Sequence, residues 1–380
     1  MAAIVRRTHP RPWILLAAAL AVTALTVAIG GIFGDEPSLR AAGIAALAGL
    51  AAIVVADRGE GADTVRLFGA SGALLAVPVA LLALVPTPGA GAERLAGADR
   101  TATAIAVSGH VFDSAEAVVV VGATSAADAV AGAPLASAVR GPLLLTGEGT
   151  AAEVSRLEAT RAYVVGAAAA DPAVAEELRD AGVREVIRVS GADRYATSAA
   201  VASRIRPDRV VVTSAWPDAI AAAPITRGGG AIVTVTPDAV PTSVAEVLQR
   251  LDPSEVVVVG GEAAVSEEVE AFLGALLPDS DVRRLAGADR WATSVAVLEA
   301  TDGPADWLWV ASGESWPDAL AASVGSSAQS RPLLLVPSGG ASPSADSVRW
   351  LVRNRTDLRQ VTVVGGDEAV SPSLVDRITR

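Results

Sequence analysis

A ten-residue phrase occurs three times in this chain, and its spacing constrains the fold more than any other feature. Each copy contains Gly-Ala-Asp-Arg, then one variable residue, then Ala-Thr. The copies are Arg94–Thr103, Arg188–Thr197 and Arg284–Thr293. Their aspartates at 99, 193 and 289 recur after 94 and then 96 residues. This period exceeds the roughly 20–50 residues of solenoid repeats and matches a small domain. We therefore expect three tandem modules over about 94–187, 188–283 and 284–380.

The residues between the phrases predict an α/β fold. In the second copy, β-branched runs at 185–189, 209–213, 231–235 and 255–259 alternate with helical patterns, and the other copies repeat this order. Continuous Val/Ile/Leu runs are typical of parallel strands that are covered on both faces. The chain ends after a helix expected over 372–378. The opening strand of the first copy is then available to complete a sheet elsewhere, which would allow closure between copies one and three.

Composition excludes several function classes. The net charge of −12 argues against nonspecific nucleic-acid binding, and the absence of cysteine excludes disulfides and thiolate chemistry. Only His9 and His110 are histidines, which leaves little material for a histidine-based triad or a zinc site. No phosphate-binding glycine motif follows an expected strand. We expect no catalytic residue, no metal and no cofactor, and therefore a protein that is not an enzyme.

Three apolar stretches precede the first phrase and are interpreted as membrane spans over 13–33, 41–56 and 67–85. The first contains no charged residue and at about 1.5 Å rise per residue covers the roughly 30 Å hydrocarbon core. The second is short, and the alternative is an interfacial or buried helix. The arginines that precede the first stretch also resemble the start of a signal peptide.

Loop charges give an expected orientation for this 1–86 anchor. Arginines lie before the first stretch and between the second and third, which places both segments in the cytoplasm. Three spans then put the repeats outside, after a short linker at 87–93, whereas an even number would leave them inside. The expected location is the cell membrane, multi-pass, with the lipid bilayer as a partner and the repeats extracytoplasmic at the wall.

The aspartate and arginine of the phrase each have two interpretations. Aspartate at a strand-to-helix turn is a preferred helix N-cap, which predicts structural roles for Asp99, Asp193 and Asp289. The following arginines either pair with a neighbouring oxygen or help to bind an anion beside the helix N-terminus. Such turns gather at the carboxyl edge of a parallel sheet, where ligands usually bind. These candidate ligand-binding arginines are Arg100, Arg194 and Arg290.

A second turn recurs as Trp-Pro-Asp-Ala at Trp216 and Trp316. Copy one has Ala126-Ala127-Asp128 instead, so the aspartate remains and the tryptophan is lost. Proline and aspartate suit the first turn of a helix. The indoles are expected either to stack on a sugar or to be partly buried in the core. A ligand that depends on this tryptophan would be bound by at most two modules.

Together, the phrase, the Trp-Pro-Asp-Ala turn, a Pro-Leu-Leu-Leu strand and a Val-Val-Gly-Gly strand end resemble the bacterial cell wall binding repeat 2 family. The resemblance implies a pseudo-threefold set of small α/β modules that bind anionic cell-wall polymers noncovalently. It also implies polymer binding by a leucine-rich strand. In this sequence the strand maps onto Leu143, Leu144 and Leu145 and onto Leu333, Leu334 and Leu335. Copy two departs from the motif with Ala231-Ile-Val233, and copy one departs with Thr101 at the aromatic position of the phrase.

The expected function is therefore that of a membrane-anchored cell-wall-binding protein. Its expected partners are an anionic cell-wall polymer or peptidoglycan-linked glycan and the lipid bilayer, with no nucleic acid. Two alternatives remain, namely an enzyme acting on envelope glycans and a surface scaffold that binds another protein.

Overall fold

The computed structural model describes residues 90–301, 305–338 and 345–379. The three expected spans and the start of the linker lie outside these residues. Where the chain is described, no helix combines the length and apolar character that crossing a bilayer requires.

The described strands form three four-stranded sheets, and every strand pair is parallel, which confirms the α/β expectation. The first sheet has the order β3 (Leu143–Leu145), β2 (Ala117–Val121), β4 (Arg161–Val165), β5 (Glu185–Val189). The second has the order β7 (Ala231–Thr234), β6 (Arg209–Thr213), β8 (Glu255–Val259), β9 (Asp281–Leu285). The third has the order β1 (Gly91–Leu95), β12 (Gln360–Val364), β10 (Trp307–Ser312), β11 (Leu333–Val336).

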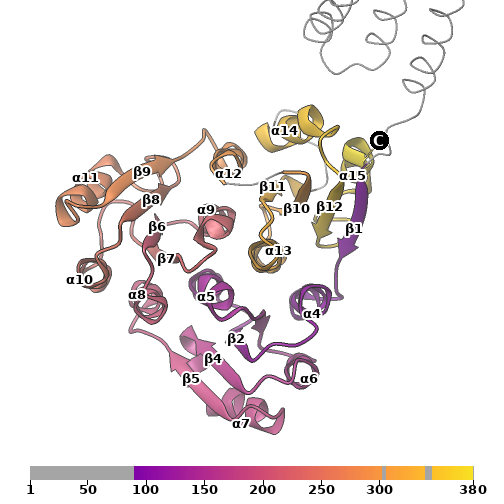
Figure 1. Ribbon diagram of the computed structural model, residues 1–380, viewed down its shortest axis with the longest axis horizontal. Helices are drawn as coiled ribbons and strands as arrows, with labels where there is room; N and C mark the ends of the chain where they lie inside the picture. The colour runs from indigo at the N-terminus through magenta and orange to yellow at the C-terminus, as the bar shows by residue number, and fades with distance from the viewer. Residues whose placement is uncertain (1–89, 302–304, 339–344, 380) are drawn as a thin grey trace, which may run out of the picture. The chain divides into compact units, whose positions relative to one another are not determined.

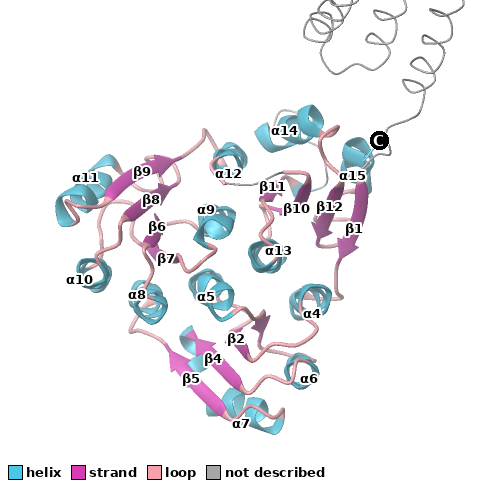
Figure 2. Cartoon of the chain, in the orientation of Figure 1, coloured by secondary structure: helices cyan, strands magenta, loops and turns pink. Residues whose placement is uncertain are grey.

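Helices cover both faces of the sheets (Figures 1 and 2). The inner helices are α5 (Ala126–Val139), α9 (Trp216–Ala222) with the 3₁₀ turn η2 (Ala223–Thr226), and α13 (Trp316–Ala328). The helices that follow the phrases are α4 (Arg100–Val111), α8 (Arg194–Ile205) and α12 (Arg290–Glu299). The outer elements are α6 (Thr150–Arg156), η1 (Gly166–Ala170), α7 (Pro172–Asp180), α10 (Thr242–Leu251), α11 (Glu267–Leu276), α14 (Asp346–Asn354) and α15 (Pro372–Thr379).

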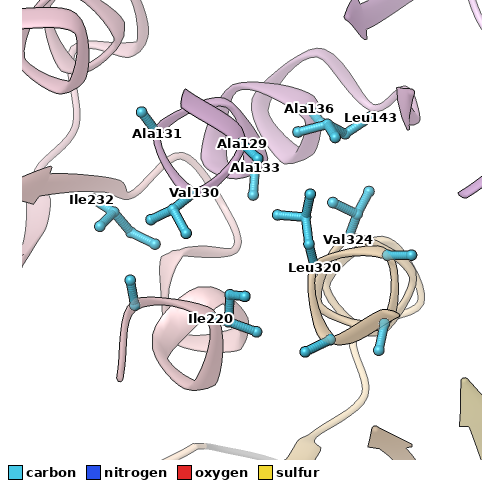
Figure 3. Packing of buried hydrophobic residues seen from close by; sticks show 14 of the residues in the cluster. Ala129, Val130, Ala131, Ala133, Ala136, Leu143, Ile220, Ile232, Leu320 and Val324 are labelled. Carbon is cyan, nitrogen blue, oxygen red and sulfur yellow. The ribbon is translucent and has the colours of Figure 1, made fainter. Parts of the chain in front are cut away.

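The side chains of each strand alternate between a shared central core and a core of its own repeat. Val119 and Val121 of β2 point into the central core, whereas Val118 and Val120 pack beneath the outer helices. The central core takes residues from all three repeats, and Figure 3 shows Val130, Ile220 and Leu320 of the inner helices within it. Alanine makes up much of the inner helices, which lets their backbones approach closely. The three repeats therefore pack as one body and are not three independent domains.

The opening strand of each repeat belongs to the sheet of another repeat. Strand β5 pairs with β4, and β9 pairs with β8, so both extend the preceding sheet. Strand β1 pairs with β12 of the third repeat, from Gly91 beside Gln360 to Leu95 beside Val364. The expected closure between copies one and three is confirmed.

This exchange of strands corrects the expected linker and qualifies the module boundaries. Residues 91–93 were expected in the linker but form the start of β1, because their pairing partner lies some 270 residues away in the chain. The boundaries at 188 and 284 fall inside β5 and β9. They mark repeats of sequence, whereas each sheet contains strands on both sides of a boundary.

Arg94 gives a test of the closure. Its guanidinium donates to the carbonyl oxygens of Gly365 at 2.7 Å and Val370 at 2.8 Å, so β1 is attached to the loop after β12. We expect Arg94→Ala to lower the free energy of unfolding by about 1–3 kcal/mol, because two buried carbonyl groups lose charged donors. Chemical denaturation measures this, with Arg188→Ala at the exposed equivalent position as the control. Equal losses in the two variants would contradict the role of Arg94 in closure.

Candidate functional site

The glycine and threonine of the phrase fold the turn between one sheet and the next. In each copy the glycine N–H donates to the threonine hydroxyl six residues later, at 3.1 Å. A Cβ atom on the glycine would overlap the alanine in the first turn of the following helix, so no larger residue fits without movement. The pairs are Gly97 with Thr103, Gly191 with Thr197, and Gly287 with Thr293.

The aspartate of the phrase occupies the N-cap position in all three copies. Asp99 accepts from Ala102 N at 2.8 Å and Asp193 from Ala196 N at 2.7 Å. Asp289 accepts from the two amides of residues 291 and 292, each at 2.9 Å. Local folding thus accounts for the glycine, aspartate, alanine and threonine of the phrase. It does not account for the arginine.

Each phrase follows a strand that completes the sheet of another repeat. It lies against the second recurrent turn of that other repeat, which is Trp-Pro-Asp-Ala in copies two and three. We call these three places junctions, and all of them are at the carboxyl edge of a sheet. Junction 1 joins residues 126–128 to 188–197, junction 2 joins 216–218 to 284–293, and junction 3 joins 316–318 to 94–103.

The aspartate of the second turn lies beside the glycine that comes directly after a neighbouring strand, β4 in the first repeat and β8 in the second. Asp128 accepts from Ala167 N at 3.1 Å, and Gly166 beside it has φ of +73°. In the second repeat a Cβ on Gly260, where φ is +114°, would lie 2.8 Å from an oxygen of Asp218. Glycine tolerates the positive φ and gives the carboxylate room. This contact explains why the Val-Val-Gly strand end recurs together with the aspartate.

Burial changes the acidity of two of these aspartates. Burial raises the pKa of Asp218 to about 6, and the nearby Arg290 opposes this rise. Burial also raises the pKa of Asp318, opposed by a hydrogen bond from Thr103 and by the charge of Arg100. All three opposing groups come from the phrase at the same junction as the aspartate, so the two halves of each of these junctions are coupled electrostatically.

Two of the three arginines bridge repeats through a tryptophan. The guanidinium of Arg290 lies 6.0 Å from the Trp216 ring and 5.8 Å from the Trp291 ring, and it donates to Gly313 O at 2.8 Å. Such cation–π contacts contribute roughly 0.5–2 kcal/mol each. At junction 3, Arg100 lies 5.6 Å from the Trp316 ring and likewise donates to a backbone carbonyl, at 2.9 Å.

Junction 1 is different because copy one lacks the tryptophan. Ala126 takes the place of Trp216, and Arg194 instead lies over the ring of its own neighbour Tyr195, at 5.9 Å. All three arginines are exposed residues. Arg194 differs in its contacts, because Arg100 and Arg290 each lie over a tryptophan of another repeat and donate to a backbone carbonyl, whereas Arg194 lies over a ring of its own repeat.

Two cavities open at these junctions. The cavity at junction 2 measures ≈ 530 Å³ and is lined by Trp216, Asp218, Arg290 and Arg194. The cavity at junction 1 measures ≈ 560 Å³ and is lined by hydroxyl, amide and carboxylate groups. Both are of a size that small ligands occupy. An indole face, guanidinium groups and carboxylates together suit a carbohydrate that carries acidic groups.

The side chains of the leucine-rich strands, to which the resemblance assigns polymer binding, do not line these two cavities. All six leucines are buried, with at most 3% of any residue exposed. Leu143, Leu145, Leu333 and Leu335 pack in the central core, and Leu144 and Leu334 pack beneath the outer helices. Strands covered on both faces hold these side chains away from the surface, and the binding role that the resemblance implies for them stays a prediction.

Sequence reasoning missed two contributors to junction 2. Trp291 occupies the variable aromatic position of the phrase, and its ring flanks Arg290. Asp218 was assigned only a structural place in the first helical turn, yet it is a buried carboxyl with a raised pKa. The recurrence of both positions was visible, but their proximity depends on the strand exchange. Over the residues that the structure describes, no group of histidine, aspartate or glutamate side chains could hold a metal ion.

Gly287 tests the structural account of the phrase. A Cβ on this residue would overlap Ala292, so we expect Gly287→Ala to destabilise the protein by about 1–3 kcal/mol, as overpacking does. Gly274 in α11 provides the control, because a Cβ there meets nothing within 4 Å and alanine favours a helix. Thermal unfolding of both variants measures the difference. A Gly287→Ala variant as stable as Gly274→Ala would contradict the packing of the turn.

The raised pKa of Asp218 predicts how the free energy of unfolding depends on pH. Its pKa rises from 3.8 to about 6 on folding, so the native state retains a proton that the unfolded state releases. The free energy of unfolding therefore falls as pH rises through this window, by about 3 kcal/mol in all. We expect Asp218→Asn to remove this loss, so that the variant gains stability over the wild type at pH 7.5 and little at pH 3.5. Denaturant titrations at both values measure it, with Asp193→Asn as the control, and a variant that is less stable at pH 7.5 would contradict the prediction.

Comparison with known proteins also divides the chain into three repeats. The family model described as Cell wall binding domain 2 (CWB2) matches residues 94–174, 188–270 and 284–375. N-acetylmuramoyl-L-alanine amidase LytC of Bacillus subtilis is 24% identical over 290 residues, which are 74% of this chain and 56% of that protein.

Among solved structures, Cwp8 from Clostridium difficile is similar with a TM-score of 0.67 and 25% identity, covering 82% of this chain and 54% of that one. Cwp6 from the same organism has a TM-score of 0.66 and 23% identity, covering 77% and 48%. The chain thus spans about half the length of the relatives it matches. The three matched segments carry the phrases, the inner helices and the sheets described above, and the chain belongs to the cell wall binding domain 2 family.

Proposed function

We propose that this protein tethers the cell membrane to the cell wall by binding an anionic wall polymer at its junctions. The family supports a cell-wall-binding role. The main observation that supports the junctions as the binding site is the cavity at junction 2, which is lined by one indole, two arginines and a buried carboxyl.

The residues of junction 2 have complementary roles toward such a polymer. The half-buried indole of Trp216 offers a flat apolar face for a sugar ring, and arginine donates two parallel hydrogen bonds to a phosphate or carboxylate. Asp218 lies deeper and can accept from a sugar hydroxyl when ionised. Because the whole chain carries a net charge of −12, attraction to a polyanion depends on these few arginines, so added salt weakens binding.

Membrane anchoring is the second part of the proposal and rests on the sequence before the repeats. The stretches at 13–33, 41–56 and 67–85 have the apolar character of spans, and the distribution of arginines between them places the repeats outside. Three spans and a wall-binding body together make a tether. A protease added to intact protoplasts then digests the repeats, whereas full protection would contradict this orientation.

Binding is tested with the full-length chain in detergent micelles and purified protein-free walls. We expect the chain to sediment with intact walls and to stay in solution with walls whose anionic polymers have been removed by mild acid. We expect Trp216→Ala and Arg290→Ala to weaken binding about tenfold each, a loss of about 1.4 kcal/mol. Phe272→Ala, an aromatic change on an exposed position of α11, and Arg188→Ala are the matched controls.

Three outcomes would contradict the proposal. Equal sedimentation with extracted walls would show that the ligand is not an anionic polymer, and failure to bind any protein-free wall would favour a protein partner. Release of peptide or sugar fragments from the walls during the assay would favour an enzyme, the activity that the name of LytC states for that relative. The same samples serve for both measurements.

A further inference from the structure

The cavities at junctions 1 and 2 are neighbours that share one wall. Ala126, Ala127 and Arg194 line both of them. The first two residues begin the inner helix α5, and the third begins α8. A ligand group placed at Arg194 is therefore accessible from either cavity.

Ala126, in this shared wall, stands where the other two repeats have tryptophan. The corresponding positions in the other repeats are Trp216 and Trp316, whose indoles lie against Arg290 and Arg100. At position 126 a methyl group stands in place of an indole, and Arg194 has no tryptophan from the preceding repeat over it. At a position that lines both cavities, Ala126 therefore lacks the indole that lies beside the arginine at junctions 2 and 3.

We propose that Ala126 joins the two cavities into one groove that binds a continuous anionic oligosaccharide. Trp216 stacks on a sugar at one end, Arg194 holds an acidic group at the middle, and the hydroxyl groups of junction 1, such as Ser125 and Ser190, bind sugar hydroxyls at the other end. This inference rests on the proposed function and specifies its ligand. In this proposal, Ala126 of copy one provides the opening between the cavities of junctions 1 and 2, which together form one binding site.

The charges along the groove restrict the polymer further. Asp128 and Asp193 line the cavity at junction 1, and Asp218, Asp289 and Arg290 line the cavity at junction 2, with Arg194 shared by both. A chain with a phosphate at every unit would place negative groups against these carboxylates. A polysaccharide whose acidic groups are separated by neutral sugars places them at the arginines and its hydroxyls at the carboxylates. The groove therefore suits the second kind of polymer.

The test replaces Ala126 with tryptophan in the full-length chain. The probes are the anionic polysaccharide released from walls by mild acid, separated into fragments of one and of several repeating units, and a glycerol phosphate oligomer of similar length. For the wild type we expect at least tenfold tighter binding of the longer polysaccharide fragment than of the single unit, measured by calorimetry. Ala126→Trp should lower the affinity for the longer fragment at least tenfold and change that for the single unit less than twofold.

Control variants separate a blocked groove from a damaged fold. Phe272→Trp introduces a tryptophan at an exposed position of α11 that lines neither cavity, and it should bind as the wild type does. Arg194→Ala should weaken the longer fragment more than the single unit, and Arg194→Lys should restore part of that loss. Melting temperatures of all variants are measured alongside.

The proposed groove is overturned if Ala126→Trp binds the longer fragment as tightly as the wild type or more tightly, as an added stacking site would. Tighter binding of the glycerol phosphate oligomer than of the polysaccharide overturns the choice of ligand. If the wild type sediments with walls but shows no dependence on fragment length, the groove fails and the wall-binding function stands. If the wild type binds neither walls nor fragments, both fail.

Discussion

The parallel pairing of each opening strand with the sheet of another repeat is the interaction on which the rest of the structure depends. Strand β1 beside β12 closes the set, in the same way that β5 and β9 connect the other two sheets. Each exchanged strand is the fourth strand of its sheet and pairs with backbone groups of β12, β4 or β8 that would otherwise lie at a sheet edge. The shared central core, with residues from all three repeats, then forms between sheets already connected.

Composite junctions are the direct result of this exchange. The phrase that follows an exchanged strand must cross from the far edge of one sheet to the helix beside the next. On that path it passes over the second turn of the repeat it leaves, which brings Arg290 to Trp216 and Arg100 to Trp316. No single repeat contains both halves of a junction. The binding that we propose at these places therefore depends on the closed set, and a damaged closure should affect junction 3 first.

The sequence alone was sufficient for features that depend on neighbouring residues. Valine runs predicted the parallel strands, and aspartate before a helix predicted the caps, because both follow from local backbone and side-chain chemistry. The position of residues 91–93 could not be predicted from neighbouring residues, since the strand with which they pair is β12. The leucines at 143–145 are a similar case, because a motif does not reveal whether a strand face is covered. Ala126 looked like a lost binding residue, and only the adjoining cavities show what its small size permits.

A crystal structure of the chain with a multi-unit fragment of the acid-released wall polysaccharide tests the central claim most directly. The account predicts density for a sugar over Trp216, an acidic group within hydrogen-bonding distance of Arg194, and continuous density into the cavity at junction 1. Density for the fragment on the outer helices, or along the edge strands β3 and β11 away from the junctions, would contradict it.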